Sequence, residues 1–247
     1  MTDIASPPKQ NWFSRLAHPG SFMAWSKPAI VPLALITAVL FLTGLYLAFF
    51  RAPLETENVG TTLPILYVHV PNAWLSQFVY GVMFLAAFGT LVWRHPLADV
   101  AAKAAAPLGA TFTALALFTG ALWGRPTWGT FWVWDARLTS MLVLFLTYLG
   151  YLALWSAIED ETKAARLAAI LCLAGAINLP IVHFSVEWWS TLHQPSSLLS
   201  GSVYPTMLRP LLTCIAGYGL TFGALVLAGM RAEIFRRRAL APVRARA

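Results

Sequence analysis

Charged residues and cysteines are both scarce in this sequence. Only 11% of the 247 residues are charged, whereas soluble globular domains have roughly 25%. The two cysteines, Cys172 and Cys214, stand inside apolar blocks, so the sequence has neither a disulfide framework nor a CxxC pair. It also has no GxxxxGK[ST] nucleotide-binding loop and no convincing serine, histidine and acid constellation. These absences argue against a disulfide-rich secreted domain, an ATPase and a serine hydrolase.

Apolar residues make up 58% of the chain, and the mean hydropathy is +0.66. They come in long unbroken blocks rather than in alternating or 3.6-residue patterns. A spanning helix needs roughly 20 mainly apolar residues, and six stretches qualify, at about 29–50, 72–93, 103–123, 138–157, 166–184 and 208–230. We therefore predict an all-α integral membrane protein with six transmembrane helices, forming a single membrane domain over residues 1–247. No cleavable signal peptide is expected, because the first 28 residues run directly into the first block.

The distribution of basic residues predicts the orientation of the chain. Thirteen Lys and Arg residues lie in the two tails and in the loops near 94–103 and 158–166, whereas Arg51, Arg125, Arg137 and Arg209 lie on the other side. By the positive-inside rule, both termini are predicted to be cytoplasmic. The net charge of +7 then reflects topology and contact with membrane lipid, and we expect no nucleic acid partner. Three outward loops are predicted, at 51–71, 124–137 and 185–207.

Tryptophan is concentrated on the outward side. Seven of the eleven tryptophans lie there, namely Trp74, Trp123, Trp128, Trp132, Trp134, Trp188 and Trp189. Four of them crowd into residues 123–134, a density that aromatic belts at the membrane interfaces do not require. If residues 128–135 form a helix, one face presents Trp128, Phe131, Trp132 and Asp135, while Trp134 points elsewhere. This pattern favours a platform for a flat ligand, and the alternative is an interfacial amphipathic segment without a ligand.

Asp135 and Arg137 each have a structural and a functional interpretation. Asp135 can cap the fourth span, and Arg137 can snorkel or pair with Glu187. In the functional interpretation, Arg137 binds the carboxylates of an anionic ligand, with Arg125 or Arg51 as helpers.

The histidines on the outward side are candidate metal ligands. His69 immediately precedes the second predicted span, and His193 lies in the third outward loop. Neutral imidazole is a standard axial ligand of haem iron, so two such histidines beside a tryptophan cluster favour a haem site. His183, at the outer end of the fifth span, is interpreted as structural or as a residue that orients a ligand. His18 and His95 lie on the inner side and are interpreted as interface residues.

Three strings carry a resemblance to a known family. YVHVPNAW precedes the second span, WGTFWVWDARLTS precedes the fourth, and NLPIVHFSVEWWSTLHQ follows the fifth. Together with the six spans, they resemble the CcmC family of haem exporter proteins, whose tryptophan-rich WWD motif handles haem in cytochrome c maturation. The resemblance covers nearly the whole chain. It implies that His69 and His193 are axial ligands of a transient, bis-histidine haem b, and that residues 128–140 form the motif that cradles the porphyrin. Phe131 stands where the family pattern usually has tryptophan.

The resemblance also implies a location and partners. It implies a multi-pass protein of the bacterial inner membrane whose haem site faces the periplasm. Such a protein would deliver haem to the haem chaperone CcmE, beside the ABC-type components CcmA and CcmB and the small membrane protein CcmD. It would be a haem-transfer protein and not an enzyme, although it could assist covalent attachment of haem to a chaperone histidine.

Two other functions stay open from the residues alone. A b-type electron-transfer subunit commonly has haem ligands within its spans, where this sequence offers only the marginal His183. A solute transporter or channel is expected to have ionisable groups near the midplane of the bilayer. The sequence places none that deep, so both alternatives are disfavoured.

Overall fold

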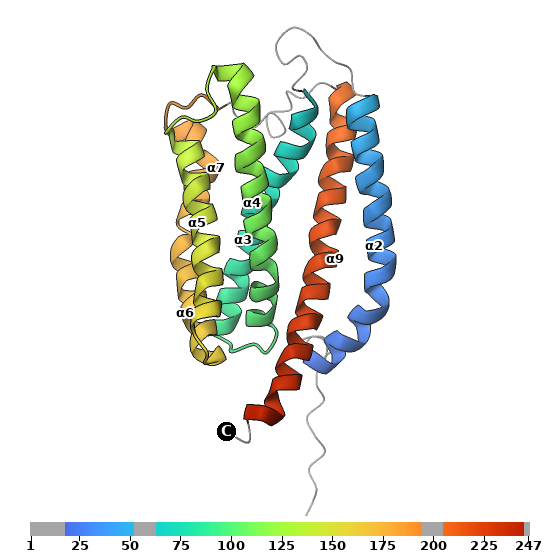
Figure 1. Cartoon of the computed structure of the whole chain (residues 1–247), viewed down its shortest axis with the longest axis vertical. Helices are drawn as coiled ribbons and strands as arrows, with labels where there is room; N and C mark the ends of the chain where they lie inside the picture. The colour runs from blue at the N-terminus through green and yellow to red at the C-terminus, as the bar shows by residue number, and fades with distance from the viewer. Residues whose placement is uncertain (1–17, 52–62, 194–204, 245–247) are drawn as a thin grey trace, which may run out of the picture.

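The computed structural model describes residues 18–51, 63–193 and 205–244. All regular elements in these ranges are helices, namely α2 Pro19–Phe50, α3 Leu63–Leu91, α4 Ala98–Trp128, α5 Ala136–Ala157, α6 Glu161–Gly175, α7 Asn178–Trp188 and α9 Pro205–Arg244 (Figure 1). Six helical segments are long and apolar enough to cross a membrane, with α6 and α7 together forming one of them. The predicted all-α fold with six spans is therefore confirmed, and the chain is a multi-pass membrane protein.

Several helices extend well beyond the spans expected from the sequence. α3 begins at Leu63, α4 covers Ala98–Trp128, and α9 continues to Arg244. Hydropathy detects only the apolar part of a helix, whereas helical hydrogen bonding continues through polar residues at the membrane surface. α3 instead extends through an apolar stretch and continues past Pro71, so His69 lies inside α3 and the expectation that it precedes the second helix is wrong.

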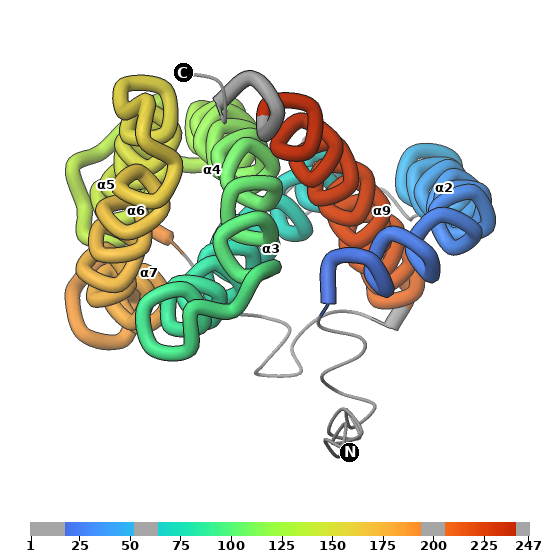
Figure 2. The backbone as a smooth tube through the Cα atoms, turned by 90° about the horizontal axis from the view of Figure 1, so that it is seen from below, coloured from blue at the N-terminus to red at the C-terminus, as the bar shows by residue number. Residues whose placement is uncertain are grey.

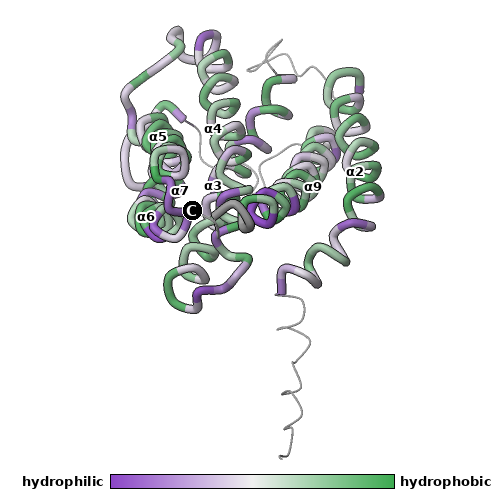
Figure 3. The backbone as a smooth tube through the Cα atoms, turned by 60° about the horizontal axis from the view of Figure 1, so that its bottom comes forward, coloured by the Kyte–Doolittle hydropathy of each residue, from purple (hydrophilic) through white to green (hydrophobic). Residues whose placement is uncertain are grey.

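The helices form three neighbouring groups, which Figure 2 shows along the bundle axis. α2 packs mainly on α9, α3 packs on α4, and α5 packs on α6 and α7. The α3 and α4 pair lies between the other two groups. Hydrophobic residues run along most of the helix length and hydrophilic residues gather near the helix ends, as a bundle in a bilayer requires (Figure 3).

Two tyrosines hold the centre of the bundle together. Tyr80 of α3 and Tyr148 of α5 are buried, and their rings meet edge to face with centres 5.3 Å apart. The Tyr148 hydroxyl donates to the Ser76 carbonyl at 2.8 Å, and the Tyr80 hydroxyl donates to the Cys172 carbonyl at 3.0 Å. Both buried hydroxyls therefore have acceptors, and the two bonds tie α3 to α5 and to α6.

The fifth span is interrupted between α6 and α7, at residues 176–177. Pro180 has no N–H with which to continue the helical pattern to the Ala176 carbonyl, and the Leu179 N–H donates to that carbonyl instead, at 3.0 Å. Just after the break, the Asn178 amide donates to the Ser140 carbonyl of α5 at 2.8 Å. This bond anchors α7 to α5 and so fixes the course of the chain toward Trp188.

Charged residues form an ion-pair network at the end of the bundle where α9 finishes (Figure 1). Glu233 of α9 accepts hydrogen bonds from Lys103 at 3.0 Å, Arg236 at 2.6 Å and Arg237 at 2.8 Å. Arg237 also pairs with Asp99 of α4 at 2.7 Å. The network joins α4 to α9 at the end opposite to the tryptophan cluster.

The contact between α2 and α9 depends on a glycine. A Cβ atom on Gly217 of α9 would lie 2.9 Å from the Cα atom of Phe41 in α2, where only backbone movement could relieve the clash. We expect Gly217→Ala to lower the free energy of unfolding by about 1–3 kcal/mol, the usual cost of overpacking. Gly219→Ala is the matched control, because nothing lies within 4 Å of a Cβ there. Thermal unfolding in detergent compares the two variants, and equal stability would contradict this close contact.

Candidate functional site

The predicted site residues gather at one end of the bundle, where α3 begins, α4 ends, α5 begins and α7 ends (Figure 1). His69 lies near the start of α3. Trp123 and Trp128 lie in the last turns of α4, and His193 follows α7. The fold thus brings together segments that are far apart in the sequence.

His69 and His193 are neighbours at this end of the bundle. Their ring centres are 6.3 Å apart, and the ring planes are inclined by 36°. Two imidazoles that share one metal ion, at metal–nitrogen distances of about 2.0–2.1 Å, have ring centres about 6 Å apart. The ring-centre distance is therefore one that two ligands of a single metal ion can have.

Two tryptophans flank the histidine pair. Trp123 meets His69 edge to face, with ring centres 5.8 Å apart, and Trp128 lies 6.2 Å from His193. Gly124 allows the Trp128 ring to lie back against α4, because a Cβ on Gly124 would come within 2.9 Å of that ring. Aromatic side chains therefore border both histidines.

Residues 128–135 do not form the helix that was considered from their spacing. α4 ends at Trp128, where Gly129 takes a left-handed conformation with a φ of 79°, which glycine adopts readily and which commonly terminates a helix. The chain is then irregular until α5 begins at Ala136. Without a helix, the spacing of the aromatic residues does not place them on one common face.

The aromatic side chains of this irregular segment differ in exposure. Phe131 is 54% exposed and Trp134 is 77% exposed, whereas Trp132 is half-buried. The Trp132 and Trp134 rings meet edge to face, with centres 5.4 Å apart. The indole Nε1 of Trp132 is buried and has no hydrogen-bond partner in the described part of the chain. Because buried indole N–H groups normally find an acceptor, this donor is available to a ligand.

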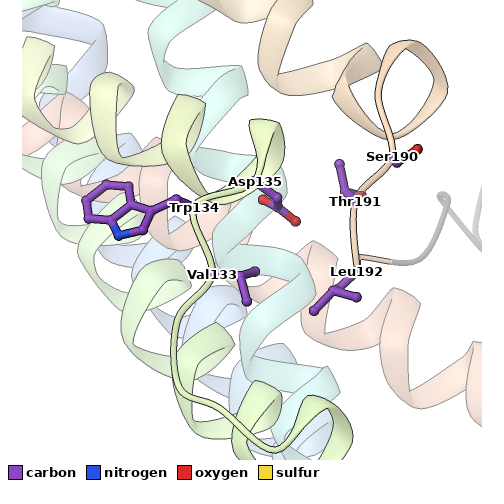
Figure 4. Close-up of a pocket in the computed structure, with 6 residues that line it drawn as sticks. All are labelled: Val133, Trp134, Asp135, Ser190, Thr191 and Leu192. Atoms are coloured by element: carbon purple, nitrogen blue, oxygen red, sulfur yellow. The ribbon is translucent and has the colours of Figure 1, made fainter.

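Asp135 caps α5 and also borders a cavity. Its Oδ1 accepts a hydrogen bond from the Leu138 N–H at 2.8 Å, while its Oδ2 is buried without a partner among the described residues. The cavity has a volume of about 290 Å³ and is lined by Val133, Trp134, Asp135, Ser190, Thr191 and Leu192. Figure 4 shows residues 133–135 facing residues 190–192, with the Trp134 ring turned away from them. The cavity thus lies between residues 133–135, at the end of the tryptophan-rich segment (residues 123–135), and residues 190–192, which lead to His193.

The helix cap at Asp135 has a measurable consequence. We expect Asp135→Ala to lower the free energy of unfolding by about 0.5–2 kcal/mol, since the Leu138 N–H loses its acceptor. Asp135→Asn is the matched control, because asparagine caps helices as well as aspartate does. Thermal unfolding of both variants measures the difference. An alanine variant as stable as the asparagine variant would contradict the cap.

Arg137 fastens α5 to α7. Its guanidinium donates to the carbonyl of Val182 and, at 3.4 Å, to the carbonyl of His183. The ion pair with Glu187 considered from the sequence is not formed among the described residues, because the guanidinium contacts these carbonyl groups instead. Arg137 therefore holds the middle of α7 against α5, and the chain continues from α7 to His193.

The two helper arginines lie in different surroundings. Arg125 donates to the Gly129 carbonyl and lies over the Phe131 ring, 5.6 Å from its centre. It therefore stabilises the turn that ends α4, beside the tryptophan-rich segment. Arg51 follows the last residue of α2, and that helix packs mainly on α9.

His183 lies apart from the histidine pair. It is exposed on α7 and lines a second cavity, of about 340 Å³, together with Trp74, Gln77, Phe78, Leu179 and Pro180. Its ring meets the Phe184 ring edge to face, with centres 4.7 Å apart. His183 thus lies on a different surface of the bundle from His69 and His193.

His69 is contacted by two residues of α4, and the sequence pattern had indicated neither of them. The hydroxyl of Thr119 lies 3.1 Å from the His69 Nδ1, and a Cβ on Gly120 would lie 3.0 Å from the His69 Cε1. Both residues share a helix face with Trp123, at spacings of four and three residues. That spacing is the signal that could have indicated them.

The fold and the site define a class: a six-span membrane protein with two histidines and a tryptophan-rich segment at one end of its bundle. The family model of CcmC, described as heme exporter protein C, matches residues 12–245. The chain belongs to this family.

Individual relatives give the same result. The chain is 57% identical over 226 residues to heme exporter protein C of Bradyrhizobium diazoefficiens, covering 90% of this chain and 85% of that protein. It is 46% identical over 212 residues to heme exporter protein C of Escherichia coli strain K12, covering 86% and 83% of the two chains. It is 42% identical over 226 residues to the protein of the same name from Rhodobacter capsulatus, covering 90% and 93%.

Proposed function

We propose that this protein binds haem between His69 and His193 and delivers it to the haem chaperone CcmE for the maturation of c-type cytochromes. The observation that carries the proposal is the 6.3 Å separation of the two imidazole rings. A porphyrin supplies four nitrogen ligands itself, so a haem requires only two axial ligands from the protein. Among the described residues, no group of three or more His, Cys, Asp or Glu could hold a metal ion. The residues present thus fit haem b better than a bare metal ion.

The tryptophan-rich segment is proposed to hold the macrocycle. Trp123 and Trp128 lie beside the two histidines, where flat indole rings can cover the apolar porphyrin. The buried, unpartnered Nε1 of Trp132 supplies a hydrogen-bond donor for a polar group of the haem. Phe131 keeps a flat ring at its position and lacks only the indole N–H.

Four further residues at this end of the bundle are proposed to border the haem. Trp134 lies at the exposed rim of the site, and Asp135 fixes the segment through its cap on α5. Arg125 and Arg137 provide positive charge for the haem propionates. Each guanidinium has five donor groups, so the hydrogen bonds to backbone carbonyls leave donors for a carboxylate.

A protein that loads a chaperone must bind haem and then release it to that chaperone. The proposed ligands lie near the start of α3 and in the segment that follows α7, at one end of the bundle. An edge of the haem can therefore stay open to a partner while the two imidazoles hold the iron. The proposed role is haem transfer rather than enzymatic catalysis, together with assistance to covalent attachment of haem to the chaperone.

The proposed orientation places the haem site at the periplasmic face of the bacterial inner membrane and both termini in the cytoplasm. It is supported by the cluster of Lys103, Arg236 and Arg237 at the opposite end of the bundle, because basic residues concentrate on the cytoplasmic side. The sequence has no nucleotide-binding loop of its own, so ATP-dependent work is assigned to CcmA and CcmB. CcmD completes the proposed assembly.

A transfer experiment tests this function. Wild-type protein purified without its partners is reconstituted with haem and then mixed with haem-free chaperone. We expect a low-spin, six-coordinate haem spectrum before mixing and movement of haem to the chaperone afterwards. Protein that binds no haem, or that holds haem which no chaperone removes, would contradict the proposal. Fast reversible electron exchange with quinol, without transfer, would instead support a b-type electron-transfer subunit.

A further inference from the structure

The His69 ring is held by a hydrogen bond whose direction can be deduced. The His69 Nδ1 lies 3.1 Å from the Thr119 Oγ1. The same Oγ1 lies 2.6 Å from the Leu115 carbonyl oxygen and 3.4 Å from the Ala116 carbonyl oxygen. A carbonyl oxygen can only accept, so the hydroxyl must be the donor in either of these contacts.

A threonine hydroxyl has one proton and two lone pairs. Once Thr119 has donated its proton to a backbone carbonyl, its oxygen can only accept from the His69 ring. Nδ1 must therefore carry the proton that lies between the two residues. In the neutral imidazole, the second nitrogen, Nε2, is then unprotonated and points away from Thr119.

We propose that Thr119 is a positioning residue that fixes His69 as the Nδ1–H tautomer and so presents Nε2 to the haem iron. The assignment of the iron rests on the function proposed above, whereas the tautomer rests on the hydrogen bonds alone. A histidine ligand commonly donates its second N–H to a nearby acceptor, which sets both the tautomer and the orientation of the ring. Thr119 performs this role from α4, and Gly120 leaves the space for the ring beside it.

Thr119→Val removes the hydroxyl while keeping nearly the same shape, and Thr119→Ser restores the hydroxyl. Because loss of such a partner typically costs about 10–100-fold in metal affinity, we expect the valine variant to bind haem at least about tenfold more weakly than wild type. The serine variant should bind close to wild type. Thr111→Val is the matched control, since Thr111 of α4 also donates to a backbone carbonyl, that of Pro107 at 2.8 Å.

Nitrogen NMR of haem-free protein with 15N-labelled histidine reads the tautomer directly. The His69 signals are assigned by their absence from His69→Ala. We expect a protonated Nδ1 and an unprotonated Nε2 in wild type and in Thr119→Ser, and loss of this preference in Thr119→Val. A wild-type His69 protonated on Nε2 would overturn the inference, whether or not haem binds.

The haem titrations separate failure of the inference from failure of the proposed function. Wild type that binds no haem contradicts the proposed function, and the NMR result still decides the tautomer. If wild type binds haem and Thr119→Val binds equally well, the positioning role is wrong. It is also wrong if Thr119→Ser is as weak as Thr119→Val, or if Thr111→Val loses as much affinity.

Discussion

His193→Ala and His69→Ala should each convert the bound haem from a six-coordinate, low-spin form into a form with one protein ligand or none. Each variant loses an iron–nitrogen bond, so the loss of affinity should exceed the roughly 10–100-fold typical of removing a residue that only orients a ligand. Visible absorption spectra of purified protein, with the haem retained per chain, measure this effect. The expectation follows from the 6.3 Å separation of the two rings.

Two other histidines supply controls for this comparison. In His95→Asn the new side chain can still accept the hydrogen bond that His95 accepts from the Leu97 N–H at 3.2 Å, and this residue is remote from the site. His183→Ala alters a histidine that lines the separate 340 Å³ cavity. Both variants should retain the wild-type spectrum. An unchanged spectrum in His69→Ala or His193→Ala removes that histidine as a ligand, and a changed one in His183→Ala makes it the candidate instead.

Gly120→Val should weaken haem binding by about 10–100-fold without removing any ligand. A Cβ on Gly120 lies 3.0 Å from the His69 Cε1, and the two valine methyl groups extend further, so the ring must move. A misplacement of about 1 Å in a reacting group can cost about 100-fold. Haem titration of the purified variant measures the loss, and thermal unfolding shows whether the bundle stays folded.

Gly81→Val controls for placing a β-branched residue in a helix of this bundle. Nothing lies within 4 Å of a Cβ on Gly81, so this variant should bind haem as wild type does. If Gly120→Val and Gly81→Val have the same affinity, the space beside His69 is not a requirement of the site.

The six spans could be predicted from the sequence because the bilayer imposes a length on every apolar block. The helix ends could not. α9 continues to Arg244 through a polar stretch beyond its apolar block, and α3 begins at Leu63 although Pro71 interrupts the apolar residues of its first turns. The break at residues 176–177 was also missed. It depends on Pro180 and on the bond from Asn178 to α5, and the apolar block continues through it.

The site could be predicted in part. His69, His193 and the tryptophans were indicated by residue type, and the structure brings the two histidines together. The common aromatic face considered for residues 128–135 does not form, because the left-handed conformation of Gly129 ends α4 at Trp128. Thr119 and Gly120 were missed. Their spacing from Trp123 places them on the same face of α4, but only the close approach of α3 to α4 shows that this face meets His69.

One haem iron is proposed to be held between His69 and His193. Pulsed electron paramagnetic resonance of the ferric haem, in protein labelled with 15N only at histidine, counts the histidine nitrogens on the iron. Two 15N ligands are expected in wild type and one in any haem that His193→Ala retains. One or no histidine nitrogen in wild type, or two in His193→Ala, would contradict the account.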